Sequence, residues 1–326
     1  MLTDDRAVGS LERMLHLRKA PIIGTLPAND LAVVAEAARP RVFRAGDVLL
    51  REDERVASAT FIVEGRVRLE RGGQRIGVIE SGSGLGGIGM LARSSAVWTA
   101  VAETDTLVLE LDADSFLDLL EDHFEILRHF LRETCRQVIG YWRALPAGTP
   151  PLVKGLRTAE ARSVKNLDLV ERIFFLRQVT PFGSASINAL AELARGFSEV
   201  QFQPGQRLWE EGDPARQVML VVDGTARCEA RDGFTLRAGP GVPLGALESV
   251  AGLPRWYDVV VTDPLTVLSG EIEMLFDVFE DNLDMALQFQ SAMSRWALAL
   301  AQQVTELAPR RLAELSGAAA APVRPD

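Results

Sequence analysis

Apolar and polar residues alternate between positions 63 and 70, which predicts a half-buried β-strand, because successive strand side chains point to opposite faces. A β-rich run at 106–111 predicts another strand. Gly65 and Gly224 each follow an acidic residue, as in the dipeptides that close β-hairpins. Short strands separated by glycine turns predict a small antiparallel barrel or jelly roll.

The spacing changes to that of an amphipathic helix after the strands. Apolar residues recur at helical intervals from 116 to 142, and Asp112 or Asp114 can cap the helix that they predict. The region is long for one globular helix, so we expect a break near Asp122 and His123.

The sequence contains an internal repeat. The heptad ERMLHLR at 12–18 returns as ERIFFLR at 171–177, an offset of 159 residues (171 − 12), and the helical pattern returns at 272–304. Because glycine accepts the positive φ of tight turns, equal glycine spacing indicates an equal backbone course. The glycines that recur at this offset are Gly46, Gly65, Gly82 and Gly86, matched by Gly205, Gly224, Gly241 and Gly245.

The repeat defines the expected architecture. We expect an α+β protein with two repeated β-jelly-roll domains and flanking helices, at residues 11–145 and 170–304. A linker with several prolines, 146–169, joins the domains, and a tail of small residues, 305–326, follows the second.

The composition limits the classes of function. The 326 residues carry 45 acidic and 35 basic side chains, a net charge of −10, which disfavours broad attraction to nucleic acid or anionic lipid. Cys135 and Cys228 give neither a disulfide framework nor a CxxC metal motif. Since no apolar run has membrane-spanning length and no basic leader occurs, we expect a cytoplasmic protein without a membrane span.

No catalytic or metal site is evident in the sequence. His16, His123 and His129 do not combine with cysteines or carboxylates at zinc-ligand spacing, and no G-x-S-x-G motif occurs. We therefore expect no enzyme activity, no metal and no other cofactor.

Each copy resembles the cyclic nucleotide-binding domain: a helix comes first, then short strands with turn glycines, a loop written LGG or LGA, and further helices. The resemblance covers both repeats. In that family a phosphate-binding cassette is typically written F-G-E-L-A-L, followed by P-R-A-A-T-V. The resemblance implies that main-chain amides and the arginine hold the cyclic phosphate, while the glutamate accepts from a ribose hydroxyl.

The first copy departs from this cassette. Leu85 stands for the phenylalanine, Gly86 matches, Gly87 replaces the glutamate and Ala96 replaces the arginine. Without both charged contacts, this copy is expected to bind cyclic nucleotide poorly. Arg93 is either a solvated loop charge or a shifted substitute for the missing arginine.

The same loop has a second interpretation, because it contains Gly82, Gly84, Gly86 and Gly87. Their amides could hold a phosphate without any side chain. The alternative is a flexible turn.

The second copy keeps part of the cassette. Leu244 stands for the phenylalanine, Gly245 matches, Ala246 replaces the glutamate, and Arg255 lies in a Pro-Arg pair. A ligand site here would use Arg255 for the phosphate and the amides after Gly245. Glu248 is either a shifted substitute for the glutamate or a surface helix residue.

Arg255 also has a structural interpretation, in which it pairs with Asp258 or stacks on Trp256. Trp256 and Tyr257 stand where the family has small residues, and their rings could fill the pocket. Both interpretations of Arg255 remain open at this point.

We expect a non-enzymatic regulatory or adaptor protein, with no nucleotide in the first module and a phosphate site in the second. The alternative is a functional cyclic nucleotide receptor that relays binding to a partner protein. The helices near 127–142 and 283–307 are candidate partner or homodimer surfaces, or else core. We expect no DNA binding, since the residues after the second repeat are too few for a helix-turn-helix domain.

Overall fold

Each sequence repeat folds into a β-jelly roll with flanking helices, which confirms the predicted α+β class with two repeated domains. The structure is a computed structural model that describes residues 9–20, 22–149 and 166–308. One compact unit ends at Phe130, and a second comprises Leu131–Ala308. The predicted linker and tail lie largely outside the described residues, so the domain bounds stay a prediction.

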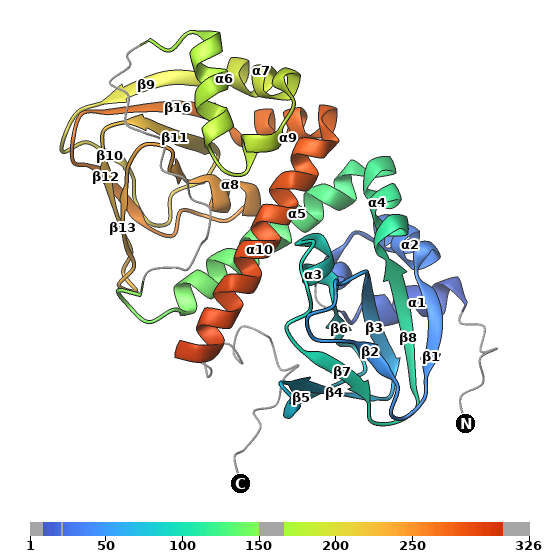
Figure 1. Cartoon of the computed structure of the whole chain (residues 1–326). Helices are drawn as coiled ribbons and strands as arrows, with labels where there is room; N and C mark the ends of the chain where they lie inside the picture. The colour runs from blue at the N-terminus through green and yellow to red at the C-terminus, as the bar shows by residue number, and fades with distance from the viewer. Residues whose placement is uncertain (1–8, 21, 150–165, 309–326) are drawn as a thin grey trace. The chain divides into compact units, whose positions relative to one another are not determined.

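The first unit contains two four-stranded antiparallel sheets (Figure 1). One has the strand order β1-β8-β3-β6 and the other the order β2-β7-β4-β5. The strands are β1 (Arg39–Phe43), β2 (Val48–Leu50), β3 (Ser58–Glu64), β4 (Arg66–Arg71), β5 (Gln74–Glu80), β6 (Gly84–Leu85), β7 (Thr99–Ala102) and β8 (Thr106–Asp112).

Helices lie before, within and after these strands: α1 (Ser10–Leu17), η1 (Ile23–Thr25), α2 (Ala28–Ala37), α3 (Gly87–Leu91), α4 (Ala113–Asp122) and α5 (Phe124–Ala144). Asp112 caps α4, because its carboxylate accepts from the Ser115 N–H at 2.9 Å. His123 separates α4 from α5, which confirms the predicted break.

The second unit repeats this topology, with sheet orders β9-β16-β11-β14 and β10-β15-β12-β13. Its strands are β9 (Ser198–Phe202), β10 (Arg207–Trp209), β11 (Gln217–Asp223), β12 (Ala226–Glu229), β13 (Thr235–Ala238), β14 (Pro243–Leu244), β15 (Asp258–Val261) and β16 (Leu265–Glu271). Its helices are α6 (Leu169–Gln178), η2 (Phe182–Ser184), α7 (Ile187–Gly196), α8 (Ala246–Ala251), α9 (Ile272–Asp281) and α10 (Leu283–Leu307).

The two jelly rolls keep the sequence offset of the repeat. Strand β1 begins at Arg39 and β9 at Ser198, and helix α4 begins at Ala113 and α9 at Ile272, both 159 residues apart (198 − 39 and 272 − 113). The recurring glycines all have positive φ, between 72° and 108°. The glycine series therefore marks equivalent turns, as the sequence predicted.

One of these turns corrects a predicted strand. The expected strand at 63–70 is interrupted, since β3 ends at Glu64 and β4 begins at Arg66. Gly65 lies between them with φ 108°, and a Cβ at this position would lie 2.5 Å from Oγ1 of Thr106. The alternating pattern thus continues across a tight turn that only glycine fits.

Apolar side chains from both sheets of the first unit form its core. One buried cluster contains Ile62, Val67, Leu85 and Ala100. Leu85 is 6% exposed, so this residue of the predicted cassette packs inside the barrel.

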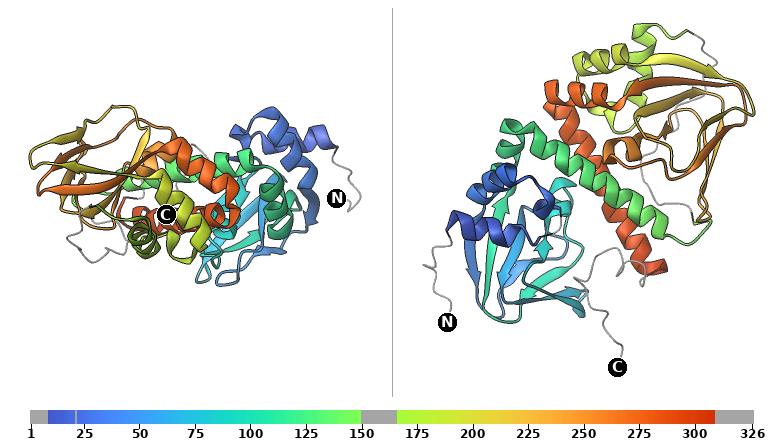
Figure 2. Two further views of the ribbon diagram at one scale, coloured as in Figure 1. Left: turned by 90° about the horizontal axis from the view of Figure 1, so that it is seen from above. Right: turned by 180° about the vertical axis from the view of Figure 1, so that it is seen from behind.

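In the second unit, α10 lies beside the part of α5 that begins at Leu131 (Figures 1 and 2). The side-chain amide of Gln290 on α10 donates to the Thr134 hydroxyl of α5 at 2.8 Å. These helices overlap the predicted partner surfaces, and this contact favours the core interpretation for the residues that make it. Among the described residues, no helix has the length and apolar character needed to cross a membrane.

Candidate functional site

The glycine loop of the second unit joins β14 to α8 at Gly245. Gly245 has φ 72°, and a Cβ at this position would overlap Nη1 of Arg255, so a side chain cannot be accommodated. The Gly245 N–H donates to the Tyr257 hydroxyl at 3.1 Å. This amide therefore already has a partner within the protein.

Arg255 is buried beside this loop, with 4% of its surface exposed. Its Nη1 donates to the Gly245 carbonyl oxygen at 2.8 Å, and its Nη2 donates to the Gln217 carbonyl oxygen at 2.7 Å. Nη1 also donates to Oγ of Ser249 at 3.3 Å. The guanidinium lies over the Trp209 ring, 4.2 Å from its centroid. Arg255 thus ties β11, the glycine loop and α8 together.

The structural partners that the sequence suggested for Arg255 are wrong. Asp258 accepts instead from the Glu211 N–H at 2.6 Å. The Trp256 ring packs against Phe234, with centroids 4.5 Å apart. The reason is that Arg255 turns toward the loop and β11, whose carbonyl oxygens satisfy the guanidinium.

Glu248 of α8 is 1% exposed, so its expected position on the surface is wrong. Its Oε1 lies 3.5 Å from Nη1 of Arg255 and has no hydrogen-bond partner among the described residues. Burial raises the pKa of Glu248 above its ordinary value, because it outweighs the lowering effect of the positive charge of Arg255. The charge of Arg255 is thus balanced by an acidic group inside the protein.

Aromatic side chains cover the loop. Trp256 and Tyr257 are 7% and 6% exposed. The ring of Phe234, which directly precedes β13, lies 5.6 Å from the ring of Trp142, centroid to centroid, with the two rings edge to face. Burial raises the pKa of Tyr257 well above its ordinary value, so its hydroxyl stays neutral while it accepts from the Gly245 N–H.

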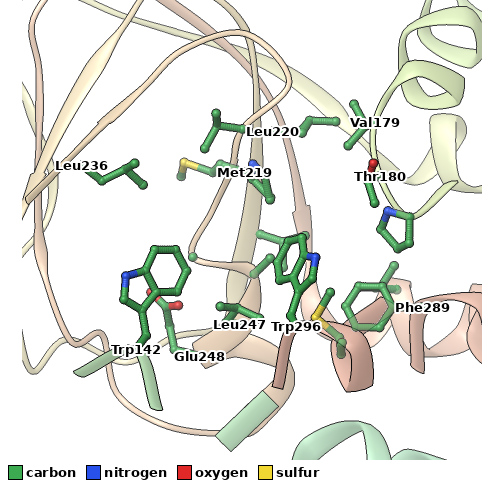
Figure 3. Close-up of a pocket in the computed structure, with 18 of the residues that line it drawn as sticks. Trp142, Val179, Thr180, Met219, Leu220, Leu236, Leu247, Glu248, Phe289 and Trp296 are labelled. Carbon is green, nitrogen blue, oxygen red and sulfur yellow. The ribbon is translucent and has the colours of Figure 1, made fainter. Parts of the chain in front are cut away.

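A cavity of about 100 Å³ extends from this aromatic cluster to the helices of the second unit (Figure 3). Trp142, Leu236 and Glu248 lie toward one end, while Thr180 and Phe289 lie toward the other (Figure 3). Met219 and Leu220 of β11 and Met293 and Trp296 of α10 are further lining residues. Among the described lining residues, Glu248 is the only charged one.

The structure separates the residues predicted for the second site. Gly245, Ala246 and Trp256 line the cavity. Arg255 is not among its described lining residues, and Leu244 is fully buried in the β-ladder opposite Met219. Arg255 contacts the glycine loop, as expected, but it does so through a hydrogen bond to Gly245. Ligand binding by these residues stays a prediction.

In the first unit, Gly86 and Gly87 join β6 to α3. A Cβ at Gly86, where φ is 78°, would lie 2.5 Å from the Ser58 carbonyl oxygen. Ala96, at the arginine position, is buried and its N–H donates to the Glu54 carbonyl oxygen at 2.8 Å. Arg93 is exposed. The loop therefore has the backbone of the second copy without its buried arginine.

Part of the glycine series in the first loop takes part in the sheet. Gly82 donates its N–H to the Ile62 carbonyl oxygen at 3.0 Å, and Gly84 pairs with Phe61 in β3. The N–H of Gly82 is thus already bonded to the main chain and is not available to a phosphate in a nest of amides.

Sequence reasoning missed Trp209 beneath Arg255, the burial of Glu248, and the cavity with Trp142 at its edge. The available signal was aromatic content, since Trp142, Trp209, Trp256 and Trp296 fall in the second unit and Trp98 in the first. No group of histidines, cysteines and carboxylates with metal-binding geometry occurs among the described residues.

Comparison with known proteins supports the resemblance. The sequence profile of the cyclic nucleotide-binding domain matches residues 40–123 and 199–282, which is 168 of the 326 residues. No match to a curated protein was found.

Similar solved structures include regulatory subunits of protein kinase A. A regulatory subunit of a cAMP-independent protein kinase A from Trypanosoma brucei is 16% identical, with a TM-score of 0.35, over 87% of this chain and 91% of the other. The regulatory domain of Toxoplasma gondii PKA, crystallised with cAMP, is 16% identical, with a TM-score of 0.33, over 88% and 95%. A cyclic nucleotide-binding-like protein from Brucella abortus is 26% identical, with a TM-score of 0.31, over 34% and 98%.

Proposed function

This chain belongs to the cyclic nucleotide-binding domain family, and from that premise we propose that it is a non-enzymatic regulatory or adaptor protein whose modules do not hold a cyclic phosphate through an arginine. Cyclic nucleotide-binding domains are regulatory rather than catalytic. A protein partner and a cytoplasmic location belong to the same proposal.

The buried environment of Arg255 is the observation that carries this proposal. The guanidinium is satisfied by the carbonyl oxygens of Gly245 and Gln217 and lies beside the carboxylate of Glu248. A phosphate would have to break these bonds and compete with a negative charge that is already buried. Removing a partner from a buried polar group costs about 1–3 kcal/mol, which opposes the gain from a new ligand contact.

The first module supports the same conclusion in a different way. Ala96 occupies the arginine position, and its N–H and carbonyl oxygen bond to the main chain of Glu54 and Asp53. The exposed Arg93 would have to leave solvent to reach a ligand.

The second unit offers a route from its cavity to helix α10. Leu247 and Glu248 of α8 line one part of the cavity, and Phe289, Met293 and Trp296 of α10 line another. A change in what fills the cavity would therefore shift the packing of α10, and such a shift can alter affinity for a partner. The proposed output is binding of a protein, with homodimerisation through α10 as one form of it.

A cyclic nucleotide receptor is the second candidate. The observation in its favour is the position of Arg255, which follows Pro254 in the sequence and donates to the Gly245 carbonyl oxygen of the loop. In this case Arg255 would exchange the Gly245 carbonyl oxygen for a phosphate.

Isothermal titration of the full chain with cAMP and cGMP tests the proposal. We expect no binding heat at millimolar nucleotide. Binding that is lost in Arg255→Lys and retained in Arg237→Lys would overturn the proposal and support a receptor. Arg237 is the matched control because it lies on β13, exposed, with an ion pair to Asp263.

A further inference from the structure

The cavity of the second unit lies among large apolar side chains. Interiors pack nearly as densely as organic crystals, and an unfilled cavity destabilises a fold in proportion to its volume. The lining side chains are large and almost fully buried, for example Leu220, Phe289 and Met293 at 4%, 5% and 2% exposure. A space of about 100 Å³ among such residues is a candidate site for a small molecule.

The size of the space limits that occupant. An engineered apolar cavity of about 150 Å³ in another protein binds benzene. The space of about 100 Å³ is smaller than that cavity, so its occupant can be no larger than about one ring. Trp142, Phe234 and Trp256 supply ring faces and edges at one end, against which another ring can pack edge to face or offset.

Two buried polar atoms without a hydrogen-bond partner indicate which chemical group could bind at the aromatic end of the cavity. Oε1 of Glu248, a hydrogen-bond acceptor that lies 3.5 Å from Nη1 of Arg255, and Nε1 of Trp256, a donor, are both buried and have no hydrogen-bond partner among the described residues. Buried polar groups in native proteins nearly always have a partner. A hydroxyl group both donates and accepts, so it matches the chemistry of this pair.

The charge distribution around the cavity disfavours an anionic ligand. Arg255 directs its guanidinium to Gly245, Gln217 and Trp209 and is not among the described lining residues. The charged group that lines the cavity is the carboxylate of Glu248. The described lining residues offer an anion no positive side chain, whereas an apolar ring gains by leaving water.

We propose that the second unit binds a small, neutral, hydroxyl-bearing ring compound of the phenol type, with its ring among Trp142, Phe234 and Trp256 and its hydroxyl donating to Glu248. The inference deepens the proposed function, on which it rests for the idea that the second module is a sensor. Water would satisfy the polar atoms but would leave the apolar space unfilled.

Titration of the full chain with phenol and with toluene tests this proposal. The two probes are of similar size, and only phenol carries a hydroxyl. We expect phenol to bind at least about tenfold more tightly than toluene, because hydrogen bonds to charged groups are the stronger ones. Equal affinities, or no binding of either probe to the folded protein, would overturn the proposal.

Variants locate the site. Leu236→Trp places a ring in the end of the cavity that contains Trp142 and Glu248, and it should abolish phenol binding (Figure 3). Ile76→Trp is the control, since Ile76 is 43% exposed on β5 of the first unit. Glu248→Gln removes the charge with little change of shape, so phenol affinity should fall toward that of toluene. Unchanged phenol binding in Leu236→Trp would place the probe elsewhere and contradict the proposal.

The phenol titration and the nucleotide titration test the two proposals separately. Phenol binding without cAMP or cGMP binding supports both proposals. Nucleotide binding that requires Arg255 overturns the proposed function alone, because the phenol and toluene titrations use a different part of the module. Failure of phenol binding leaves the absence of nucleotide binding intact.

Discussion

Nη1 of Arg255 donates to the carbonyl oxygen of Gly245 at 2.8 Å, across the turn where β14 passes into α8. The bond is possible because Gly245 has no Cβ, which would otherwise occupy the position of the guanidinium. The arginine and the glycine therefore depend on each other. Both residues belong to the cassette motif of the family, and here their contact is made within the chain.

The first prediction concerns this close approach. Gly245→Ala forces a side chain into left-handed backbone at φ 72° and against Arg255, whereas Gly205→Ala meets the backbone strain alone, at φ 86° with nothing within 4 Å. The strain costs roughly 1–2 kcal/mol in either variant. We expect a larger loss of unfolding free energy for Gly245→Ala in urea denaturation. Equal losses would show that Arg255 does not hold this position in solution.

The second prediction concerns the pair of Arg255 and Glu248, which are 4% and 1% exposed. Arg255→Met leaves the buried carboxylate without a balancing charge, and breaking such a pair costs about 3–5 kcal/mol. Replacing both residues, as Arg255→Met with Glu248→Leu, should recover much of that loss because no charge remains buried.

Tryptophan fluorescence during urea unfolding measures this effect, since Trp142, Trp209, Trp256 and Trp296 lie in the second unit. Additive effects of the two substitutions would contradict the pairing. Arg237→Met, at an exposed ion pair with Asp263, serves as the control and should change stability by no more than about 1 kcal/mol.

The fold could be predicted from the sequence because backbone signals repeat. The glycines at turns, the break at His123 and the cap at Asp112 act locally, and each occurs where the pattern indicated. The strand at 63–70 was predicted less well, since alternation of apolar residues continues through the turn at Gly65.

The site could be predicted only in part, because its chemistry depends on contacts between distant residues. The cassette motif located Gly245 and Arg255, and their direct bond did not follow from spacing. The burial of Glu248 depends on a partner seven positions further along the chain (255 − 248) and on rings from β10 and α5. Side-chain direction of this kind is decided by tertiary packing.

The third prediction uses a difference between the repeats. Asp112 caps α4 through the Ser115 N–H, while the equivalent Glu271 makes no cap bond to α9. Asp112→Ala should therefore cost about 1 kcal/mol of unfolding free energy at neutral pH. Glu271→Ala is the matched control and should show no loss of this kind.

The same cap makes a prediction about pH. Hydrogen bonds from the N–H and hydroxyl of Ser115 lower the pKa of Asp112 from its ordinary 3.8. A carboxylate with a lowered folded pKa stabilises the fold above its ordinary pKa, and this contribution is lost as the pH falls through the folded pKa. The difference in stability between wild type and Asp112→Ala should therefore shrink as the pH falls below 3.8, and it should disappear below the lowered pKa of the folded state. A difference that persists in acid would contradict the cap as its source.

The last prediction concerns the cysteines, both fully buried in the second unit. Burial raises the pKa of Cys228 to about 12 and raises that of Cys135 as well, with the Glu248 charge acting in the same direction on both. Since the thiolate is the reactive form, neither thiol should react with Ellman's reagent in the native protein at about pH 8. Both should react in guanidinium, and Cys135→Ser and Cys228→Ser assign the two signals. Rapid labelling of either thiol without denaturant would contradict the packing of β12 or α5, because the reagent must contact the sulfur.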